Sequence, residues 1–253
     1  MDARRSLNVT LLEQSMLGRE VIVLDEVDST NDYLLGRSGE LRDGAIVIAE
    51  AQSAGRGRRG RAWVAPRSAA LLFSILVKAG EAFPVADFPQ LTHLAAVAVA
   101  GGVEGAQIKW PNDVYLDGHK LAGILVEARG DCAVVGIGIN VDTRPEEFPE
   151  DLEVPATSLR IASGRPVDRE AFLCALVGRF KAWKGSPMPF ADFIELQVKP
   201  ISLLLGREIE YQVDGVMRRG WAVDLAPGGE LVVDPGDGSR LELNSVDQVR
   251  LAL

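Results

Sequence analysis

The sequence predicts an α+β protein in which a larger mixed domain precedes a small all-β domain. Three observations support this prediction. Two hairpin signals in the middle of the chain, Asp117-Gly118 and Arg129-Gly130-Asp131, separate apolar runs and indicate an antiparallel meander. The alanine-rich stretch between Phe88 and Gly101 has the spacing and length of a buried helix. After Pro200 the chain changes to short apolar runs joined by glycine-rich turns, which is typical of a small β-barrel.

The first half of the chain alternates helices and strands. A helix is expected to end near Leu17, where Gly18 stops it. Apolar runs then predict strands at 21–24, 45–49 and 71–77, the buried helix follows at 88–101, and the meander runs to a strand at 133–140.

The second half begins with residues 141–166, which are rich in Pro, Glu and Asp and predict an exposed excursion. Asp168 then caps a helix that runs toward Trp183. Short strands are expected at 201–205, 208–213, 220–224, 230–233 and 240–243. We therefore expect one domain over 1–200 and a second over 201–253.

The composition limits the function. The chain has 253 residues, 47% hydrophobic residues and a formal net charge of -9. No apolar run approaches the length needed to cross a bilayer, so we expect a cytoplasmic protein without a membrane partner. Cys132 and Cys174 are expected to be buried, reduced thiols, and the isolated His93 and His119 exclude a zinc site and a Ser-His-Asp relay. The negative charge argues against a general nucleic-acid surface.

A loop from Gly55 to Arg61 contains four arginines and three glycines. Glycine allows close backbone approach, and arginine binds phosphate or carboxylate oxygens in pairs, so the loop predicts an anion site. Gly55-x-Gly57-x-x-Gly60 also matches the dinucleotide-binding pattern, but residues 61–66 are not helix-like, which excludes the strand-turn-helix context of that motif. A disordered basic loop is the plain alternative.

Four other segments have a structural and a functional interpretation. Ser29-Thr30-Asn31 could form a capping box with Asp32, and Lys120 could be a solvated hairpin lysine. Lys109-Trp110-Pro111-Asn112-Asp113 is an unusual strand ending. The glycines of Gly136-Ile137-Gly138-Ile139-Asn140 mark either a bulge or a close approach by backbone or ligand.

In this order the segments resemble one family, the biotin–protein ligases, also called biotin–[acetyl-CoA-carboxylase] ligases. The resemblance covers about residues 20 to 253. The residues that carry it are Asp28 to Asn31, Gln52, Gly55 to Arg61, Trp63, Lys109 to Asp113, Lys120 to Glu127, and Gly136 to Asn140.

The resemblance implies a catalytic domain like that of class II aminoacyl-tRNA synthetases, with a mixed, largely antiparallel sheet flanked by helices, followed by an SH3-like β-barrel. The ligase pattern begins about twenty residues after Met1, so the short form without an N-terminal DNA-binding domain is expected, and no DNA partner. Two departures from the family pattern lie at 244–248 and at Ser68 to Phe73.

The implied reaction has two steps. With Mg²⁺, the enzyme would join biotin and ATP to form biotinyl-5'-AMP and pyrophosphate. It would then transfer biotin to a lysine in the biotin carboxyl carrier domain of a biotin-dependent carboxylase. The family includes monomers and homodimers, and neither the oligomeric state nor the carrier's identity can be read from the sequence.

The resemblance also implies residue roles. Lys120 and Arg58 are expected to be catalytic, with Asp113 near the metal. Residues expected to bind biotin are Ser29, Thr30, Asn31, Gln52, Gly55, Arg56, Gly57, Arg58, Lys120 and Gly123. Residues expected to bind ATP or the adenylate are Arg56, Arg58, Arg61, Trp63, Asn112, Lys120 and Asn140. Trp63 and Trp110 are candidate walls for adenine or the biotin tail.

Physical chemistry explains why such a reaction needs these side chains. An anion must approach a polyanion, and each pair of unit charges near 4 Å is worth about 4 kcal/mol at an effective dielectric constant of 20. Cations from the loop and Lys120 would offset this repulsion. A glycine-rich loop could also order over the adenylate and exclude water.

Two alternatives remain at this point. Lipoate–protein or octanoate–protein ligases share the adenylation logic, but their Arg-Arg…Gly-Gly-Gly pattern with a nearby histidine is missing here. A non-catalytic RNA-binding module that uses the arginine–glycine loop would leave Gln52, Lys120 and the 109–113 segment unexplained.

Overall fold

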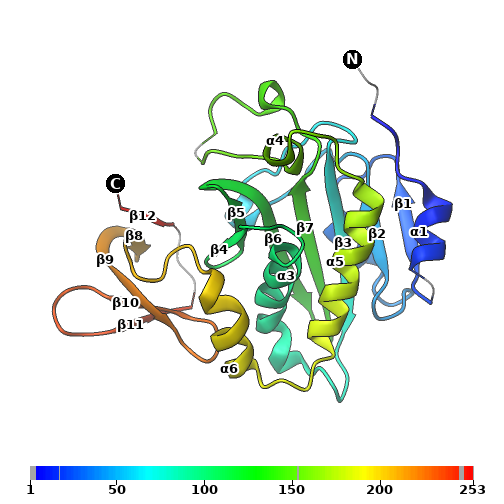
Figure 1. Ribbon diagram of the computed structural model, residues 1–253. Helices are drawn as coiled ribbons and strands as arrows, with labels where there is room; N and C mark the ends of the chain where they lie inside the picture. Colours follow the sequence, from blue (N-terminus) through cyan, green and yellow to red (C-terminus); the bar gives the residue numbers. More distant parts are fainter. Residues whose placement is uncertain (1–3, 17, 153, 245–247, 253) are drawn as a thin grey trace.

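The computed structural model describes residues 4–16, 18–152, 154–244 and 248–252. Two sheets form the framework (Figure 1). The larger sheet has the strand order β1-β2-β3-β7-β6-β5-β4, with β1 and β2 parallel and the other neighbours antiparallel. Its strands are β1 (Val21–Leu24), β2 (Ile46–Ala49), β3 (Ala70–Lys78), β4 (Gln107–Lys109), β5 (Asp113–Leu116), β6 (His119–Arg129) and β7 (Cys132–Asn140). The predicted α+β class and the antiparallel meander are therefore confirmed.

Helices cover both faces of the larger sheet. Those that accompany it are α1 (Val9–Ser15), α2 (Thr30–Arg37), α3 (Leu91–Ala100), α4 (Leu159–Ser163) and α5 (Arg169–Lys184). Helices α3 and α5 lie on one face (Figure 1) and α2 packs on the other, against the apolar side chains of Val47, Leu76 and Val134. Because side chains alternate along a strand, β3 and β7 can contribute to a separate apolar layer on each face.

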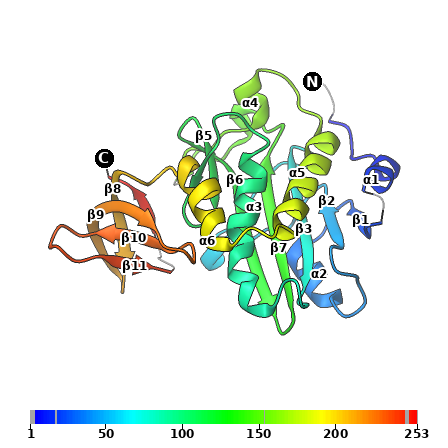
Figure 2. The same cartoon turned by 60° about the horizontal axis from the view of Figure 1, so that its bottom comes forward.

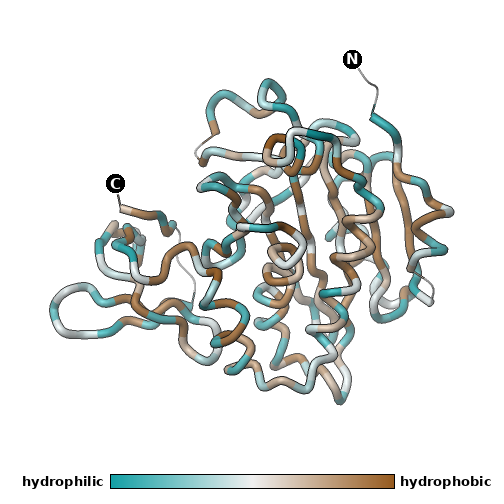
Figure 3. Tube along the Cα trace, viewed as in Figure 1, coloured by the Kyte–Doolittle hydropathy of each residue, from teal (hydrophilic) through white to brown (hydrophobic). Residues whose placement is uncertain are grey.

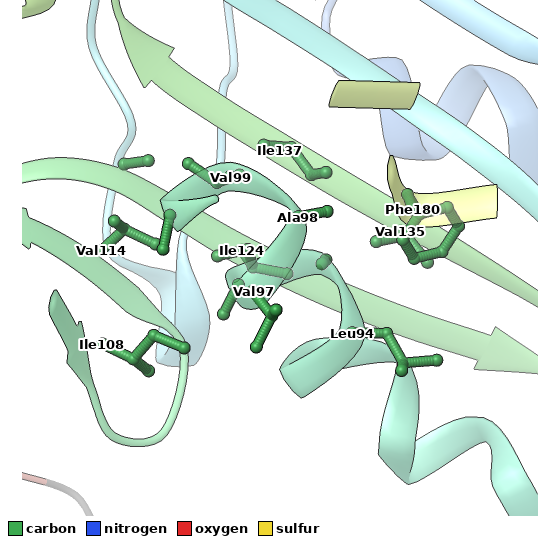
Figure 4. Packing of buried hydrophobic residues seen from close by; sticks show 14 of the residues in the cluster. Leu94, Val97, Ala98, Val99, Ile108, Val114, Ile124, Val135, Ile137 and Phe180 are labelled. Carbon is green, nitrogen blue, oxygen red and sulfur yellow. The ribbon is translucent and has the colours of Figure 1, made fainter. Parts of the chain in front are cut away.

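The main core lies between the sheet and helices α3 and α5. Figure 4 shows Ala98 of α3 beside Ile137 and Val135 of β7, and Val97 of α3 beside Ile124 of β6. Nine residues of α3 are buried, as expected for a helix that is apolar on all sides. The expected start at Phe88 is too early, since residues Val85–Gln90 form a 3₁₀ helix. Pro89 has no N–H, which explains why the α-helical hydrogen bonds begin after it.

The second sheet is antiparallel and five-stranded, with the order β11-β10-β9-β8-β12. Its strands are β8 (Arg207–Val213), β9 (Val216–Leu225), β10 (Leu231–Asp234), β11 (Leu241–Leu243) and β12 (Val249–Leu251). Helix α6 (Phe190–Phe193) and a π-helical turn (Ile194–Val198) lead to it from α5. In Figure 2 this sheet, called the C-terminal sheet below, lies beside α6 at one side of the molecule.

The strand expected at 201–205 is wrong. Lys199–Ile201 form a 3₁₀ turn, and Leu203 and Leu204 are buried at the junction of the two sheets. The Leu203 N–H donates to the Ile108 carbonyl of β4 over 2.8 Å. The apolar run therefore reflects packing at this junction and not a place in the C-terminal sheet.

Hydropathy follows the architecture. In Figure 3 hydrophobic residues run along the strands of the larger sheet, while many connecting loops are hydrophilic. Among the described residues no helix is long and apolar enough to cross a membrane. Of the two cysteines, Cys132 is buried as expected, whereas Cys174 is partly exposed.

Candidate active site

A cavity of about 160 Å³ opens on the face of the larger sheet that carries α2. We call it the α2-side cavity. Thirteen of the side chains or glycines proposed from the sequence line it: Ser29, Thr30, Asn31, Gln52, Arg56, Gly57, Arg58, Arg61, Trp63, Asn112, Asp113, Lys120 and Gly123. They come from five separate segments of the chain, which the sequence alone could not place together.

Three of the proposed residues lie elsewhere. Gly55 is buried and does not line the cavity, and a Cβ atom at this position would lie 2.5 Å from the Trp63 carbonyl oxygen. Asn140 is buried at the end of β7, paired with Ala70 of β3. Trp110, a candidate wall for the ligand, does not line this cavity: it is 3% exposed, and its indole N–H donates to the Gly229 carbonyl over 2.9 Å.

Two glycines of β7 make room for the cavity. A Cβ atom on Gly136 would lie 2.2 Å from Asn31 Oδ1, and one on Gly138 would lie 2.5 Å from Trp63 Cε2. The pairing of β7 with β3 and β6 shows no register shift at these positions. The glycines therefore mark a close approach and not a bulge, which decides between the two interpretations left open by the sequence.

The start of α2 supplies polar groups. Ser29 Oγ accepts from the Asp32 N–H over 3.4 Å, so Ser29 caps α2, and it also lines the cavity. The reciprocal bond of the expected capping box is not formed, because the Ser29 N–H donates to Asp28 Oδ1 over 2.7 Å. The Thr30 N–H and hydroxyl both lie within hydrogen-bond distance of Gln52 Oε1, at 2.8 and 3.0 Å. Gln52 thereby fixes the N-terminus of α2 against the strand-to-loop connection.

Ser74 and Glu127 were not proposed from the sequence as site residues. The hydroxyl of Ser74 lies 2.7 Å from Thr30 Oγ1 and 2.6 Å from Asn31 Oδ1, and Ser74 is fully buried. Asn31 Nδ2 donates to Glu127 Oε2 over 2.7 Å. The sequence contained a signal for Ser74, because it is the one polar residue in the apolar run 71–77. A buried hydroxyl in such a strand needs a hydrogen-bond partner.

The arginine–glycine loop folds back on itself. The Gly57 N–H donates to the Arg61 carbonyl over 2.7 Å, the Trp63 N–H donates to the Gly55 carbonyl over 2.9 Å, and Arg58–Gly60 form one 3₁₀ turn. No α-helix follows the turn, in agreement with the exclusion of a dinucleotide-binding motif.

Arg56 lies between two carboxylates. Its Nη2 is 2.7 Å from Asp32 Oδ1 and 3.1 Å from Glu127 Oε2. Burial disfavours the charged form of Arg56, but Glu127 and Asp32 outweigh it and raise its pKa above the usual value. These contacts join the loop, α2 and β6 at the rim of the cavity.

Lys120 forms an ion pair with Asp113, whose Oδ1 lies 2.8 Å from the lysine Nζ. The backbone of Lys120 is held as well, since its N–H donates to the Pro155 carbonyl and its carbonyl accepts from the Thr157 N–H. A solvated hairpin lysine would have neither feature. The expectation that 141–166 is an exposed excursion is therefore wrong near its end, where the chain returns to β6 and packs there.

Positive charge concentrates beside this ion pair. Burial lowers the pKa of Arg58 and of Lys109, although Asp113 opposes both shifts. A neighbouring cavity of about 420 Å³ continues from Arg58 and Arg61 past Lys109 to Arg250 of β12. Arg58 and Lys109 are the partly desolvated cations here, whereas Arg61 and Arg250 are exposed and Arg250 pairs with Glu210. Partly desolvated cations attract an anion with several charges.

Within the described part of the chain, no three His, Cys, Asp or Glu side chains gather into a metal site. Asp113 is the carboxylate that lines the α2-side cavity. Mg²⁺ commonly binds one or two carboxylates together with substrate phosphates, so a single Asp fits an ion that arrives with a nucleotide.

Comparison with protein families matches residues 23–143 to the biotin/lipoate A/B protein ligase family. The biotin–[acetyl-CoA-carboxylase] ligase of Mycobacterium tuberculosis is 34% identical over 98% of this chain and 95% of its own length. The bifunctional ligase/repressor BirA of Escherichia coli is 44% identical over 96% of this chain and 79% of its length. The match to BirA of Bacillus subtilis, at 33% identity, spans only 60% of that protein.

The solved structures give the same result. A biotin protein ligase from Aquifex aeolicus in complex with biotin and ATP has a TM-score of 0.79 and 29% identity, over 92% of this chain and 99% of that one. The same arrangement of a mixed sheet with flanking helices and a second antiparallel sheet is thus present in a protein that holds both small molecules.

Proposed function

This chain belongs to the biotin/lipoate A/B protein ligase family, and we propose on that premise that it is an ATP-dependent biotin–protein ligase. It activates biotin as biotinyl-5'-AMP and then transfers biotin to a lysine of a biotin carboxyl carrier protein. The carrier belongs to a biotin-dependent carboxylase, such as acetyl-CoA carboxylase.

The observation that carries this proposal is the set of groups that line the α2-side cavity. Ser29, Thr30 and Gln52 offer hydrogen-bonding groups, and the cations Arg58 and Lys120 line the same cavity from separate segments. Trp63 and Ile137 add apolar lining. Biotin has the matching groups: a ureido ring, an aliphatic chain and a carboxylate.

In the first step a carboxylate oxygen of biotin bonds to the α-phosphorus of ATP, and the bond from that phosphorus to the bridging oxygen of pyrophosphate breaks. Lys120, Arg56 and Arg58 offset the repulsion between the two anions. Lys120 is suited to follow the moving charge because its ammonium group is compact. Arg61, Asn112 and Trp63 contact the nucleotide part, and Lys109 and Arg250 extend the cationic surface.

In the second step the amine nitrogen of the carrier lysine bonds to the biotinyl carbonyl carbon. The carbon–oxygen bond to AMP breaks, and the nitrogen loses a proton. We propose that the 55–61 loop covers the adenylate between the steps, which protects the mixed anhydride from water.

Mg²⁺ is part of the proposal. It would bind the phosphates of ATP with Asp113 as its protein ligand, and would neutralise charge that passes to pyrophosphate. Asp113 would then exchange its partner Lys120 for the metal, which leaves the ammonium group available to the substrate.

The finer assignments of the fold are proposals too. The larger sheet and its helices correspond to a class II synthetase-like catalytic domain over 1–200, and the C-terminal sheet to an SH3-like domain over 201–253. The separate strand orders of the two sheets support this division. The altered segment at 244–248 lies partly outside the described residues.

The decisive experiment is exchange of labelled pyrophosphate into ATP with Mg²⁺, in three reactions that contain biotin, lipoate or no acid. Exchange that depends on biotin supports the proposal. Exchange with lipoate alone assigns the chain to lipoate activation, and no exchange with either acid contradicts adenylation.

A further inference from the structure

A buried contact from the C-terminal sheet reaches the segment that carries Asn112 and Asp113. The turn between β9 and β10, residues 226–230, packs against the larger sheet through the backbone of Gly229. The Gly229 carbonyl accepts from Trp110 Nε1 over 2.9 Å, and Trp110 is 3% exposed. Trp110 precedes Asn112 by two positions, so the contact lies next to the α2-side cavity without lining it.

Gly229 allows this approach because of its backbone and its missing side chain. Its φ is +92°, and a Cβ atom would lie 2.4 Å from Nε2 of His93 on α3. His93 is buried, with Phe190 of α6 packed beside it. The turn is therefore seated between α3 and Trp110, and a larger residue at 229 would move it outward.

A second contact holds the same hairpin. The Leu203 N–H, at the entrance to the C-terminal sheet, donates to the Ile108 carbonyl of β4 over 2.8 Å. Ile108 and Trp110 thus fix both the strand and the turn of the β4–β5 hairpin (107–116) from outside the larger sheet. Without them β4 would be an edge strand with neighbours only on one side.

The hairpin passes this restraint to the cavity. The Asn112 carbonyl accepts from the Ile124 N–H over 2.9 Å, and Asn112 Nδ2 donates to the Ile124 carbonyl over 2.8 Å. The next residue, Asp113, pairs with Lys120. Moving Trp110 would shift the partner of Lys120 while leaving the start of α2 in place.

We propose that Trp110 is a positioning residue. Through its hydrogen bond to Gly229, the C-terminal sheet determines the position of Asn112 and of the Asp113–Lys120 pair. This inference rests on the proposed function for its kinetic consequence but not for its structural one. Displacements near 1 Å can cost on the order of 100-fold in rate, so the adenylation step should be sensitive to this contact.

The test compares Trp110→Phe with the wild type and with Trp221→Phe, a control at an indole 52% exposed on β9. Trp110→Phe keeps the ring and removes the N–H. We expect kcat for biotin-dependent pyrophosphate exchange to fall about 10-fold or more, with KM for biotin within about twofold of wild type. The control should match the wild type in both. A merely structural role would lower the melting temperature without this split between kcat and KM.

Hydrogen–deuterium exchange of the free protein gives a readout that needs no activity. In Trp110→Phe the amides of Asp113 and Ile124 should exchange about 10-fold faster, while those of α2 stay unchanged. Gly229→Ala should give the same pattern from the other side of the contact, and decides the question if Trp110→Phe does not fold. If the wild type shows no biotin-dependent pyrophosphate exchange, that result contradicts the proposed function alone. The amide exchange pattern still tests whether the Trp110–Gly229 contact positions Asn112 and Asp113. Unchanged amides at 113 and 124 in a folded variant overturn the inference.

Discussion

Asp113 Oδ1 lies 2.8 Å from Nζ of Lys120, and the two residues belong to facing strands of a hairpin whose loop is only Asp117-Gly118. The pair holds a cation in the lining of a cavity that gathers groups from six segments. It also means that Lys120 is already oriented before any ligand binds.

Replacing Lys120 with Gln should abolish most adenylation. The variant keeps a polar side chain of similar length but loses the charge that offsets the two reacting anions. We expect kcat for biotin-dependent pyrophosphate exchange to fall by about 100-fold or more. Lys120→Arg should recover only part of the rate, because the planar guanidinium places its charge differently. Full activity in Lys120→Gln would remove it from the catalytic group.

Gly138→Ala should weaken biotin binding. The added Cβ would lie 2.5 Å from the Trp63 ring, which must move into the cavity or out of the site. We expect the Kd for biotin, measured by calorimetry, to rise at least about 10-fold, consistent with the cost of overpacking. Gly178→Ala in α5 is the matched control, since nothing lies within 4 Å of its added Cβ, and its Kd should equal that of the wild type.

Arg58→Gly should release the adenylate early. Arg58 lines both cavities from the 3₁₀ turn of the loop, and its removal opens the cover over the mixed anhydride. Free biotinyl-5'-AMP should then label lysines of an added bystander protein, detected by avidin blot. Arg165→Gly, at an exposed loop position, serves as control. Tight retention of the adenylate by Arg58→Gly would refute the role of the loop.

The stability of the protein should depend on pH through His93. Burial lowers the pKa of His93 to about 4, with Glu230 and the Gly229 backbone opposing this shift. A depressed histidine pKa means that the unfolded chain binds more protons between pH 6.5 and about 4. The free energy of unfolding therefore falls as the pH falls through this window, on the order of 3 kcal/mol in total.

Urea unfolding at pH 7 and pH 4.5 measures the effect. His93→Leu should show a smaller loss of stability between the two values than the wild type, whereas His119→Leu, at the exposed first residue of β6, should keep the wild-type difference. An equal loss in wild type and His93→Leu would contradict the assignment.

The buried pair of Arg169 and Glu50 should be costly to break from one side. Arg169 Nη1 lies 2.9 Å from Glu50 Oε2, and their side chains are 7% and 5% exposed. Arg169→Met leaves an isolated buried carboxylate, which we expect to lower the free energy of unfolding by about 3–5 kcal/mol. Adding Glu50→Gln should recover a large part of this loss. Additive effects of the two changes would show that the pair is not coupled.

Local patterns were enough to predict the meander, the buried helix and the β-rich end, because hairpin turns and periodicity act over short stretches. They failed at 201–205, where leucines are buried by a junction between sheets, and at 155–157, which pair with Lys120. Both errors involve contacts between distant segments, which no local pattern encodes.

For the candidate site, too, local patterns identified single residues, whereas contacts between distant segments could not be predicted. The roles expected for Lys120 and Gln52 came from resemblance, and their convergence required the fold. Trp110 was expected as a wall for adenine or the biotin tail; it lines the neighbouring cavity of about 420 Å³ and not the α2-side cavity, and its N–H donates to Gly229. Ser74 could have been noticed as a lone hydroxyl in an apolar strand, whereas its two partners on α2 could not.

The two carboxylates around Arg56 also affect which anions can bind at the rim. Asp32 and Glu127 already occupy the Nη2 side of its guanidinium group, so any incoming anion competes with them for that side. A small ion such as chloride or acetate offers little in return, whereas a ligand that also contacts the other residues lining the α2-side cavity gains binding energy along its whole length. On the proposed function, the ion pairs at the rim would therefore favour long carboxylic acids over the simple anions that are abundant in solution.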